Sequence, residues 1–239
     1  MAHFLLIHGA CHGGWCWEHI VPLLEAAGHR VEAPDLPGHG ADPTPLSELS
    51  MEACGAFVAE SASGAGEPIV LVGHSMAGAV ISWAAERVPQ AIRRLVYLTA
   101  YIPRSGESLA SLARRDTEAE TRSERVEIDG TECFRIPKYA ARYAFYQDAD
   151  DPTFDMAFDR IGPEPVHVFW EKADFTEEKF GRVSRAYIHC AQDKAIGPAL
   201  QQEMVEATYC GPLFTLDGGH SPFLTAPDAL AQILLSLGE

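Results

Sequence analysis

Three residues of the types used in nucleophilic catalysis stand in loops that follow apolar runs. Ser75 comes after the run Ile69 to Val72, Asp193 after the segment Arg185 to Cys190, and His220 after the segment Leu213 to Leu216. A serine hydroxyl becomes a strong nucleophile only when a neighbouring base takes its proton and a third group orients that base. We therefore interpret Ser75 as a nucleophile, His220 as its base and Asp193 as the orienting acid.

The residues around Ser75 favour a tight turn between a strand and a helix. The sequence Gly73-His74-Ser75-Met76-Ala77-Gly78 joins a buried strand to an apolar helical stretch that ends near Pro89. This is the setting of a nucleophile elbow, in which the neighbours of the serine must be small. The usual pattern is G-x-S-x-G, and Ala77 at its last position is interpreted as a tolerated variant.

Other residues compete for the roles of acid and base. Asp217 is the alternative acid, but it lies only three residues before His220 in the same loop, so Asp193 is favoured. His220 is favoured as the base because the pair Gly218-Gly219 lets its backbone approach the sheet edge. The other candidate histidines are expected to have structural roles, in loops, in a turn, beside the nucleophile, in the cap or in a strand. They are His8, His12, His39, His74, His167 and His189.

A serine hydrolase also needs N–H donors for the oxyanion that develops on the substrate. The residue after the nucleophile supplies one backbone amide, here Met76. The second donor is expected from the glycine-rich loop after the first strand, where Ala10 follows His8-Gly9.

The order of apolar segments predicts an α/β fold with a mostly parallel sheet covered by helices on both faces. Strands are expected at 3–7, 30–34, 69–72, 94–99, 185–190 and 213–216, with helices at 15–27, 51–62, 198–207 and 227–237. Ligands in such sheets bind at the carboxyl ends of the strands, where Ser75, Asp193 and His220 all fall. We expect residues 1–102 and 183–239 to form the core.

The segment 103–182 breaks the alternation of strands and helices and is expected to form a helical cap (lid) over the site. It includes a candidate hairpin turn at Asp129-Gly130. Some of its aromatic residues are expected to line a pocket, the rest to form the core of the cap: Phe145, Tyr146, Phe154, Phe158, Phe169 and Trp170.

Composition limits the classes of partner. The formal net charge of −16 argues against nucleic acid and anionic membrane surfaces, which attract basic patches. The six cysteines lack paired spacing and are expected to be reduced, and Cys11, His12 and Cys16 lack a second half of a zinc site. Neither a signal peptide nor a run long enough to span a bilayer is evident, so a cytoplasmic protein is expected.

With these residues identified, the chain resembles the α/β-hydrolase superfamily, and within it the group of plant methyl esterases and hydroxynitrile lyases. The similar segments are HFLLIHGACHGGWCWEHIVPLLEAAGH, LVGHSMAG, ADFTEEKFGRVSRAYIHCAQDKAI and DGGHSPF, and only the region from about Gly106 to Lys138 fits the pattern poorly. The chain order Ser, Asp, His is also that of the superfamily. The resemblance implies a catalytic triad of Ser75, Asp193 and His220, with oxyanion donors at Ala10 and Met76.

The same group contains two chemistries, and two positions separate them. Its lyases typically carry Thr immediately after the first-loop His and Lys immediately after the catalytic His, where this chain has Gly9 and Ser221. The resemblance therefore implies a serine carboxylesterase that hydrolyses small methyl, short-chain or aryl esters and uses neither a cofactor nor a metal. The alternatives are a lyase that cleaves a C–C bond and a non-catalytic protein that binds a small ligand. The sequence leaves a homodimer open.

Overall fold

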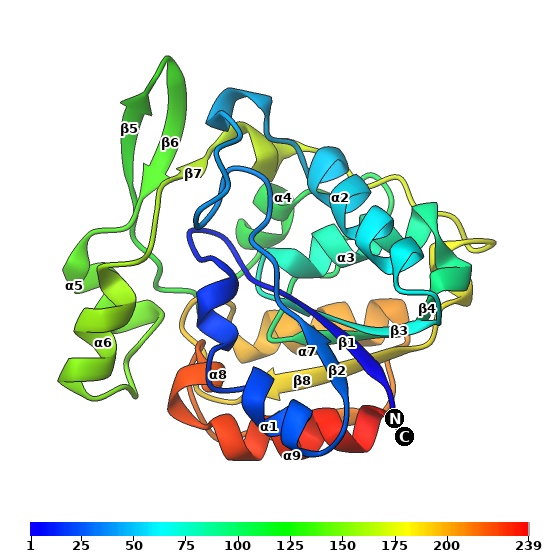
Figure 1. Cartoon of the computed structure of the whole chain (residues 1–239). Coiled ribbons are helices and arrows are strands. Elements are labelled where there is room, and N and C mark those ends of the chain that lie inside the picture. Colours follow the sequence, from blue (N-terminus) through cyan, green and yellow to red (C-terminus); the bar gives the residue numbers. More distant parts are fainter. Residues whose placement is uncertain (239) are drawn as a thin grey trace.

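Six short strands form one parallel sheet in the computed structural model, which describes residues 1–238 (Figure 1). Their order across the sheet is β2-β1-β3-β4-β8-β9, and every neighbouring pair is parallel. The bounds are β1 (His3–Ile7), β2 (Arg30–Glu32), β3 (Ile69–His74), β4 (Ile92–Leu98), β8 (Arg185–Cys190) and β9 (Leu213–Leu216). The predicted α/β fold with a parallel sheet is confirmed, and each predicted strand is present within two residues of its expected bounds.

Alternating side chains of the central strands divide the apolar core in two. In β3, Leu71 packs on one face of the sheet and Val70 and Val72 on the other. The first face carries α2 (Met51–Gly64), α3 (Ala77–Arg87) and α7 (Pro198–Thr208), whereas α1 (Val21–Ala26) and α9 (Pro227–Gly238) cover the second (Figure 1). Both faces of the sheet are therefore buried, which explains why its strands are continuous apolar runs.

The first predicted helix is divided in the structure. Residues 15–27 were expected to be one helix, but a 3-10 turn, η1 (Gly14–Trp17), comes first and α1 begins only at Val21. Pro22 occupies the first turn of α1. Proline lacks an N–H group and its ring clashes with the carbonyl four residues earlier, so the helix cannot continue through it from Trp17.

The segment 103–182 contains strands as well as helices, so it is less helical than expected. Its helices are α4 (Leu109–Ala113), α5 (Lys138–Ala144) and α6 (Asp151–Phe158), and its strands β5 (Glu124–Ile128), β6 (Thr131–Arg135) and β7 (Glu164–Pro165) form a separate antiparallel sheet. Asp129 and Gly130 make the hairpin turn between β5 and β6, both with positive φ. Figure 1 shows β5, β6, α5 and α6 at one side of the main sheet.

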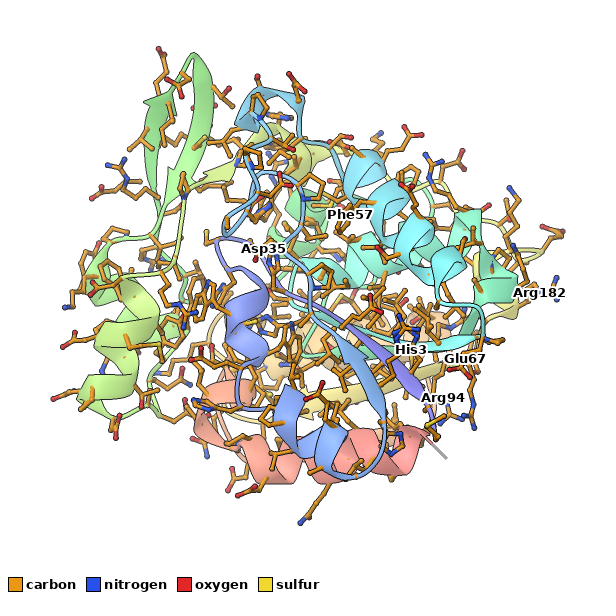
Figure 2. All side chains as sticks on the ribbon, viewed as in Figure 1. His3, Asp35, Phe57, Glu67, Arg94 and Arg182 are labelled. Carbon is orange, nitrogen blue, oxygen red and sulfur yellow. The ribbon has the colours of Figure 1, made fainter. Side chains whose placement is uncertain are left out.

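Short elements complete the chain: η2 (Leu46–Glu48), η3 (Pro89–Ala91), η4 (His167–Trp170), η5 (Phe180–Arg182) and α8 (Pro222–Thr225). Asp35, labelled in Figure 2, lies in the loop after β2. It accepts hydrogen bonds from the backbone amides of Gly14 (2.7 Å) and Ala41 (2.9 Å) and so joins this loop to the residues after β1. All six cysteines are free thiols. Within residues 1–238, no helix combines the length and apolar character needed to cross a membrane.

Candidate active site

Ser75 lies at the junction of β3 and α3 in a backbone conformation that only a few non-glycine residues adopt. Its φ is +55°. The Ser75 carbonyl accepts hydrogen bonds from the amides of Gly78 (3.1 Å) and Tyr101 (3.0 Å), which hold the turn from two sides. A Cβ atom at Gly9 would lie 2.8 Å from the Ser75 Cβ, so only glycine lets the first loop approach this closely. The turn therefore presents a half-buried hydroxyl at the carboxyl end of the sheet.

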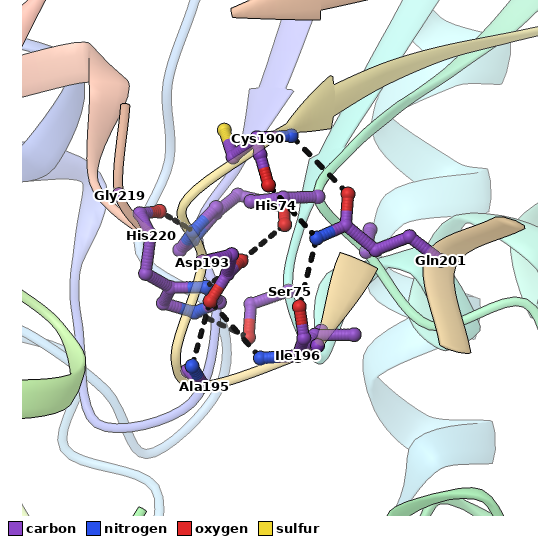
Figure 3. A network of polar contacts seen from close by, with 12 residues as sticks. His74, Ser75, Cys190, Asp193, Ala195, Ile196, Gln201, Gly219 and His220 are labelled. Atoms are coloured by element: carbon purple, nitrogen blue, oxygen red, sulfur yellow. Dashed lines mark hydrogen bonds and ion pairs between the residues drawn. The ribbon is translucent and has the colours of Figure 1, made fainter. Parts of the chain in front are cut away.

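A continuous chain of contacts joins Ser75 to His220 and Asp193 (Figure 3). The Ser75 Oγ lies 3.1 Å from the His220 Nε2, and the His220 Nδ1 lies 2.7 Å from the Asp193 Oδ2. His220 and Asp193 are buried at 2 % and 3 % exposure. With Nδ1–H donating to the carboxylate, Nε2 is free to accept the serine proton, which is the arrangement that a serine nucleophile requires.

Four donors converge on the Asp193 carboxylate. Besides His220, the Thr99 hydroxyl donates to Oδ2, and the amides of Ala195 (2.6 Å) and Ile196 (3.0 Å) donate to Oδ1. These contacts fix the carboxylate in position beside the imidazole. Asp217, the alternative acid, is exposed and accepts a hydrogen bond from Gln192 instead.

Two further side chains hold this network in place. The His74 Nε2 donates to the His220 backbone carbonyl (2.9 Å), and burial lowers the pKa of His74 well below its usual value, so its ring is neutral. Gln201 of α7 donates to the carbonyls of Cys190 (3.3 Å) and Ile196 (2.7 Å) at the two ends of the loop that carries Asp193 (Figure 3). His74 was expected only to pack beside the nucleophile, but it fixes the backbone of His220.

The amides expected to hold an oxyanion flank the same hydroxyl. Ala10, Met76 and Ser75 all border one cavity. Within residues 1–238, neither the Ala10 nor the Met76 amide donates to a protein acceptor. Amides without protein acceptors, in residues that border a cavity beside a nucleophile, are suited to bind an oxygen that becomes negative.

The cavity has a volume of about 400 Å³ and lies between the sheet edge and the segment 103–182. Phe145, Phe169 and Trp170 line it, together with Phe134 and Tyr101. Tyr146 and Phe154 instead pack in the apolar core, and Phe158 packs against that core. An apolar cavity of this size with one reactive hydroxyl at its wall accommodates a small organic molecule.

The remaining histidines lie outside the Ser75–His220–Asp193 network. His8 donates to the Gly9 carbonyl, His12 contacts the Tyr146 hydroxyl (2.7 Å) and His167 contacts the Leu49 carbonyl (2.8 Å). Burial lowers the pKa of His12 to about 4, so its ring is neutral.

His39 forms a contact that was not predicted from the sequence. Its Nε2 lies 2.8 Å from the Glu164 Oε2, and both side chains are almost wholly buried. The two residues are 125 positions apart, so only the folded chain brings them together. A glutamate within a short stretch of proline, valine and aromatic residues was the one available signal that this carboxylate would be buried.

Comparison with known proteins places the chain in a family. Residues 4–233 match the model of the alpha/beta hydrolase family. Salicylic acid-binding protein 2 of Nicotiana tabacum is 32% identical over 99% of this chain and 97% of its own length. Methylesterase 1 of Arabidopsis thaliana is 30% identical over 99% of this chain and 96% of its own length. The crystal structure of polyneuridine aldehyde esterase superimposes with a TM-score of 0.89 at 25% identity, with 100% of both chains covered. The chain therefore belongs to the α/β hydrolase family and resembles its plant methylesterases.

Proposed function

We propose that this protein is a serine carboxylesterase that acts on small esters through an acyl-enzyme on Ser75. The observation that carries the proposal is the contact chain from the Ser75 hydroxyl through His220 to Asp193 at the wall of an apolar cavity. The similarity to proteins named methylesterases supports ester hydrolysis as the reaction.

In the first half of the reaction, Ser75 Oγ attacks the ester carbonyl while His220 Nε2 takes its proton. Asp193 stays ionised and holds the imidazolium through Nδ1–H. The amides of Ala10 and Met76 donate to the oxyanion of the tetrahedral intermediate. His220 then gives its proton to the leaving alkoxide oxygen, and the alcohol departs from the acyl-enzyme.

In the second half, water enters and His220 Nε2 takes one of its protons as the oxygen attacks the acyl carbon. A second tetrahedral intermediate forms in the same oxyanion site. Its collapse breaks the bond to Ser75 Oγ, which recovers its proton from His220, and the carboxylic acid is released. Each proton that leaves a nucleophile thus passes through the single nitrogen that faces Ser75.

The size and lining of the cavity support small esters as substrates. Aromatic and aliphatic side chains dominate its wall, and the rings of Phe134, Phe145 and Phe169 are available to pack against an acyl group. A volume of about 400 Å³ suits a small acid with an aromatic or short aliphatic part. We propose methyl esters first, since a methanol leaving group needs little room beside His220.

Turnover of a panel of methyl and p-nitrophenyl esters by the wild-type protein and by Ser75→Ala tests this function. We expect hydrolysis by the wild type and a loss of several orders of magnitude in kcat for the variant, because the triad acts as a unit. Cyanide release from an aromatic cyanohydrin without ester turnover would instead identify a lyase. Tight binding of a product acid with negligible turnover across the panel would identify a binding protein.

A further inference from the structure

A buried carboxylate of the segment 103–182 meets the loop that carries Ala10. Glu164 lies in β7 with 1% of its surface exposed. Its Oε2 accepts two hydrogen bonds from the core of the protein, one from the Cys11 amide (2.9 Å) and one from the His39 Nε2 (2.8 Å). The Cys11 amide belongs to the peptide group next to the one that contains the Ala10 amide, so this contact adjoins the expected oxyanion donor.

Cys11 itself is held in an unfavourable backbone conformation. Its φ is +66°, in the left-handed region that non-glycine residues seldom occupy. The Cys11 carbonyl accepts a hydrogen bond from the Gly162 amide (2.7 Å), so both polar groups of its backbone are bonded to residues 162–164. A strained residue persists only where its surroundings over-determine it, and here these surroundings include the Glu164 carboxylate.

His39 supplies the positive charge that this carboxylate needs in the protein interior. Its two ring nitrogens both face acceptors, Nδ1 the Pro37 carbonyl (2.8 Å) and Nε2 the Glu164 Oε2, so both carry protons. Burial acts to lower the pKa of His39, but the charge of Glu164 and the hydrogen bond to it outweigh burial and raise the pKa to about 9. Several titratable groups interact electrostatically with His39: Glu164, Asp35, Asp42, His8 and His12.

We propose that Glu164 is a positioning residue for the oxyanion hole, acting through Cys11 and held in place by protonated His39; the proposal rests on the function given above. Release of the Cys11 amide lets that residue relax from its positive φ. The relaxation turns the peptide group between Ala10 and Cys11. The Ala10 amide belongs to the peptide group before that one, whose Gly9 carbonyl accepts a hydrogen bond from the His12 amide (3.3 Å), so the displacement reaches the Ala10 amide through the Ala10 backbone. Glu164 of β7 thereby favours the loop conformation in which the reacting oxygen meets both donors.

Glutamine has nearly the same shape as glutamate but cannot replace it here. It lacks the charge that keeps His39 protonated. A neutral His39 that still donates from Nδ1 to Pro37 presents a lone pair on Nε2, which the amide oxygen of a glutamine would face. In the wild type, one oxygen of Glu164, Oε2, accepts from both the Cys11 amide and the His39 Nε2. A glutamine can place either its NH₂ group there, which suits a neutral His39, or its oxygen, which suits the Cys11 amide, but not both.

The test compares Glu164→Gln with Glu171→Gln as a matched control. Glu171 is also a carboxylate of the segment 103–182 that accepts from a core amide, that of Met51 (3.0 Å), and that amide begins α2 instead of adjoining the oxyanion loop. Steady-state kinetics on an acetate and a benzoate ester give kcat and KM. Inhibition by a trifluoromethyl ketone, which forms an oxyanion when Ser75 adds to it, reports on the oxyanion hole without turnover.

Removal of an oxyanion donor costs about 10² to 10³ in kcat, so a displaced donor should cost at least about tenfold. We expect Glu164→Gln to lower kcat by about 10- to 100-fold, equally for the acetate and the benzoate ester. The affinity for the ketone should fall by a similar factor. Glu171→Gln should keep both values within about twofold of the wild type.

An unchanged ketone affinity in Glu164→Gln would overturn the positioning role, as would a loss seen with only one acyl group, which would indicate direct contact with the substrate. An equal loss in Glu171→Gln would show that either change simply destabilises the segment 103–182. That result would also overturn the positioning role of Glu164. Failure of the wild type to hydrolyse any ester or bind the ketone would overturn the proposed function instead, and this inference with it.

Discussion

The change Asp193→Asn should abolish most activity while it leaves the shape of the site intact. Asp193 accepts four hydrogen bonds, two on each carboxylate oxygen. In an asparagine, one of these positions becomes an NH₂ donor. The amide oxygen is expected to stay at the Oδ1 position, since the fixed backbone amides of Ala195 and Ile196 both point at it. The NH₂ group then faces His220.

This orientation changes the tautomer of His220. An NH₂ group at the Oδ2 position donates to Nδ1, so the imidazole proton moves to Nε2, where it points at the Ser75 Oγ. A base that already carries a proton on Nε2 cannot take another from the serine. The same change in a Ser-His-Asp triad lowers kcat by about 10⁴-fold, which corresponds to about 5 kcal/mol of activation free energy.

The assay is kcat/KM on a p-nitrophenyl ester, with Asp217→Asn as the matched control. Asp217 is exposed and bonded to Gln192, so its change should leave kcat/KM within about twofold. Circular dichroism should show both variants folded. If Asp193→Asn kept more than about a tenth of the wild-type rate, the orienting role of Asp193 would be refuted. A large loss in Asp217→Asn would show that the acid had been assigned to the wrong residue.

Two further outcomes follow from buried contacts. The surroundings of His39 raise its pKa from 6.5 to about 9 in the folded protein, so protonation of His39 should stabilise the fold by about 3 kcal/mol below pH 6.5, and this contribution should be lost as the pH rises through 9. Urea unfolding from pH 6 to 10 should show this loss in the wild type, whereas an equal loss in His39→Gln would contradict it. The change Gly9→Ala should lower kcat by at least about tenfold, because its Cβ would lie 2.8 Å from the Ser75 Cβ and displace the nucleophile. An unchanged kcat in that variant would show that the first loop moves to accommodate the added methyl group and leaves Ser75 in place.

Local patterns in the sequence were sufficient to predict most of the sheet and the neighbourhood of Ser75. A strand buried on both faces is a continuous apolar run, as in β3, and a turn that admits only small residues shows as glycine and alanine around the serine. The single helix predicted over 15–27 was wrong, although Pro22 was a signal in the sequence that a helix would not continue through this position.

The polar contacts that support the site could not be predicted in the same way. Thr99 donates to Asp193 from 94 residues away, and His74 reaches the His220 carbonyl across 146 residues. His39 was expected in a turn and Glu164 was assigned no role, because nothing in their neighbours along the chain shows that the two side chains meet. The Glu164–His39 pair depends on the packing of β7 against the loops of the core, which is a property of the whole fold.

The most direct test of the central claim is mass spectrometry of the protein after treatment with a serine-directed organophosphonate, combined with an ester turnover assay. We expect one adduct, on the peptide that contains Ser75, and loss of turnover in proportion to labelling. Ser75→Ala should take up no label. Full ester turnover by a protein labelled at Ser75, or an adduct on another serine that accounts for the lost activity, would contradict the role assigned to Ser75.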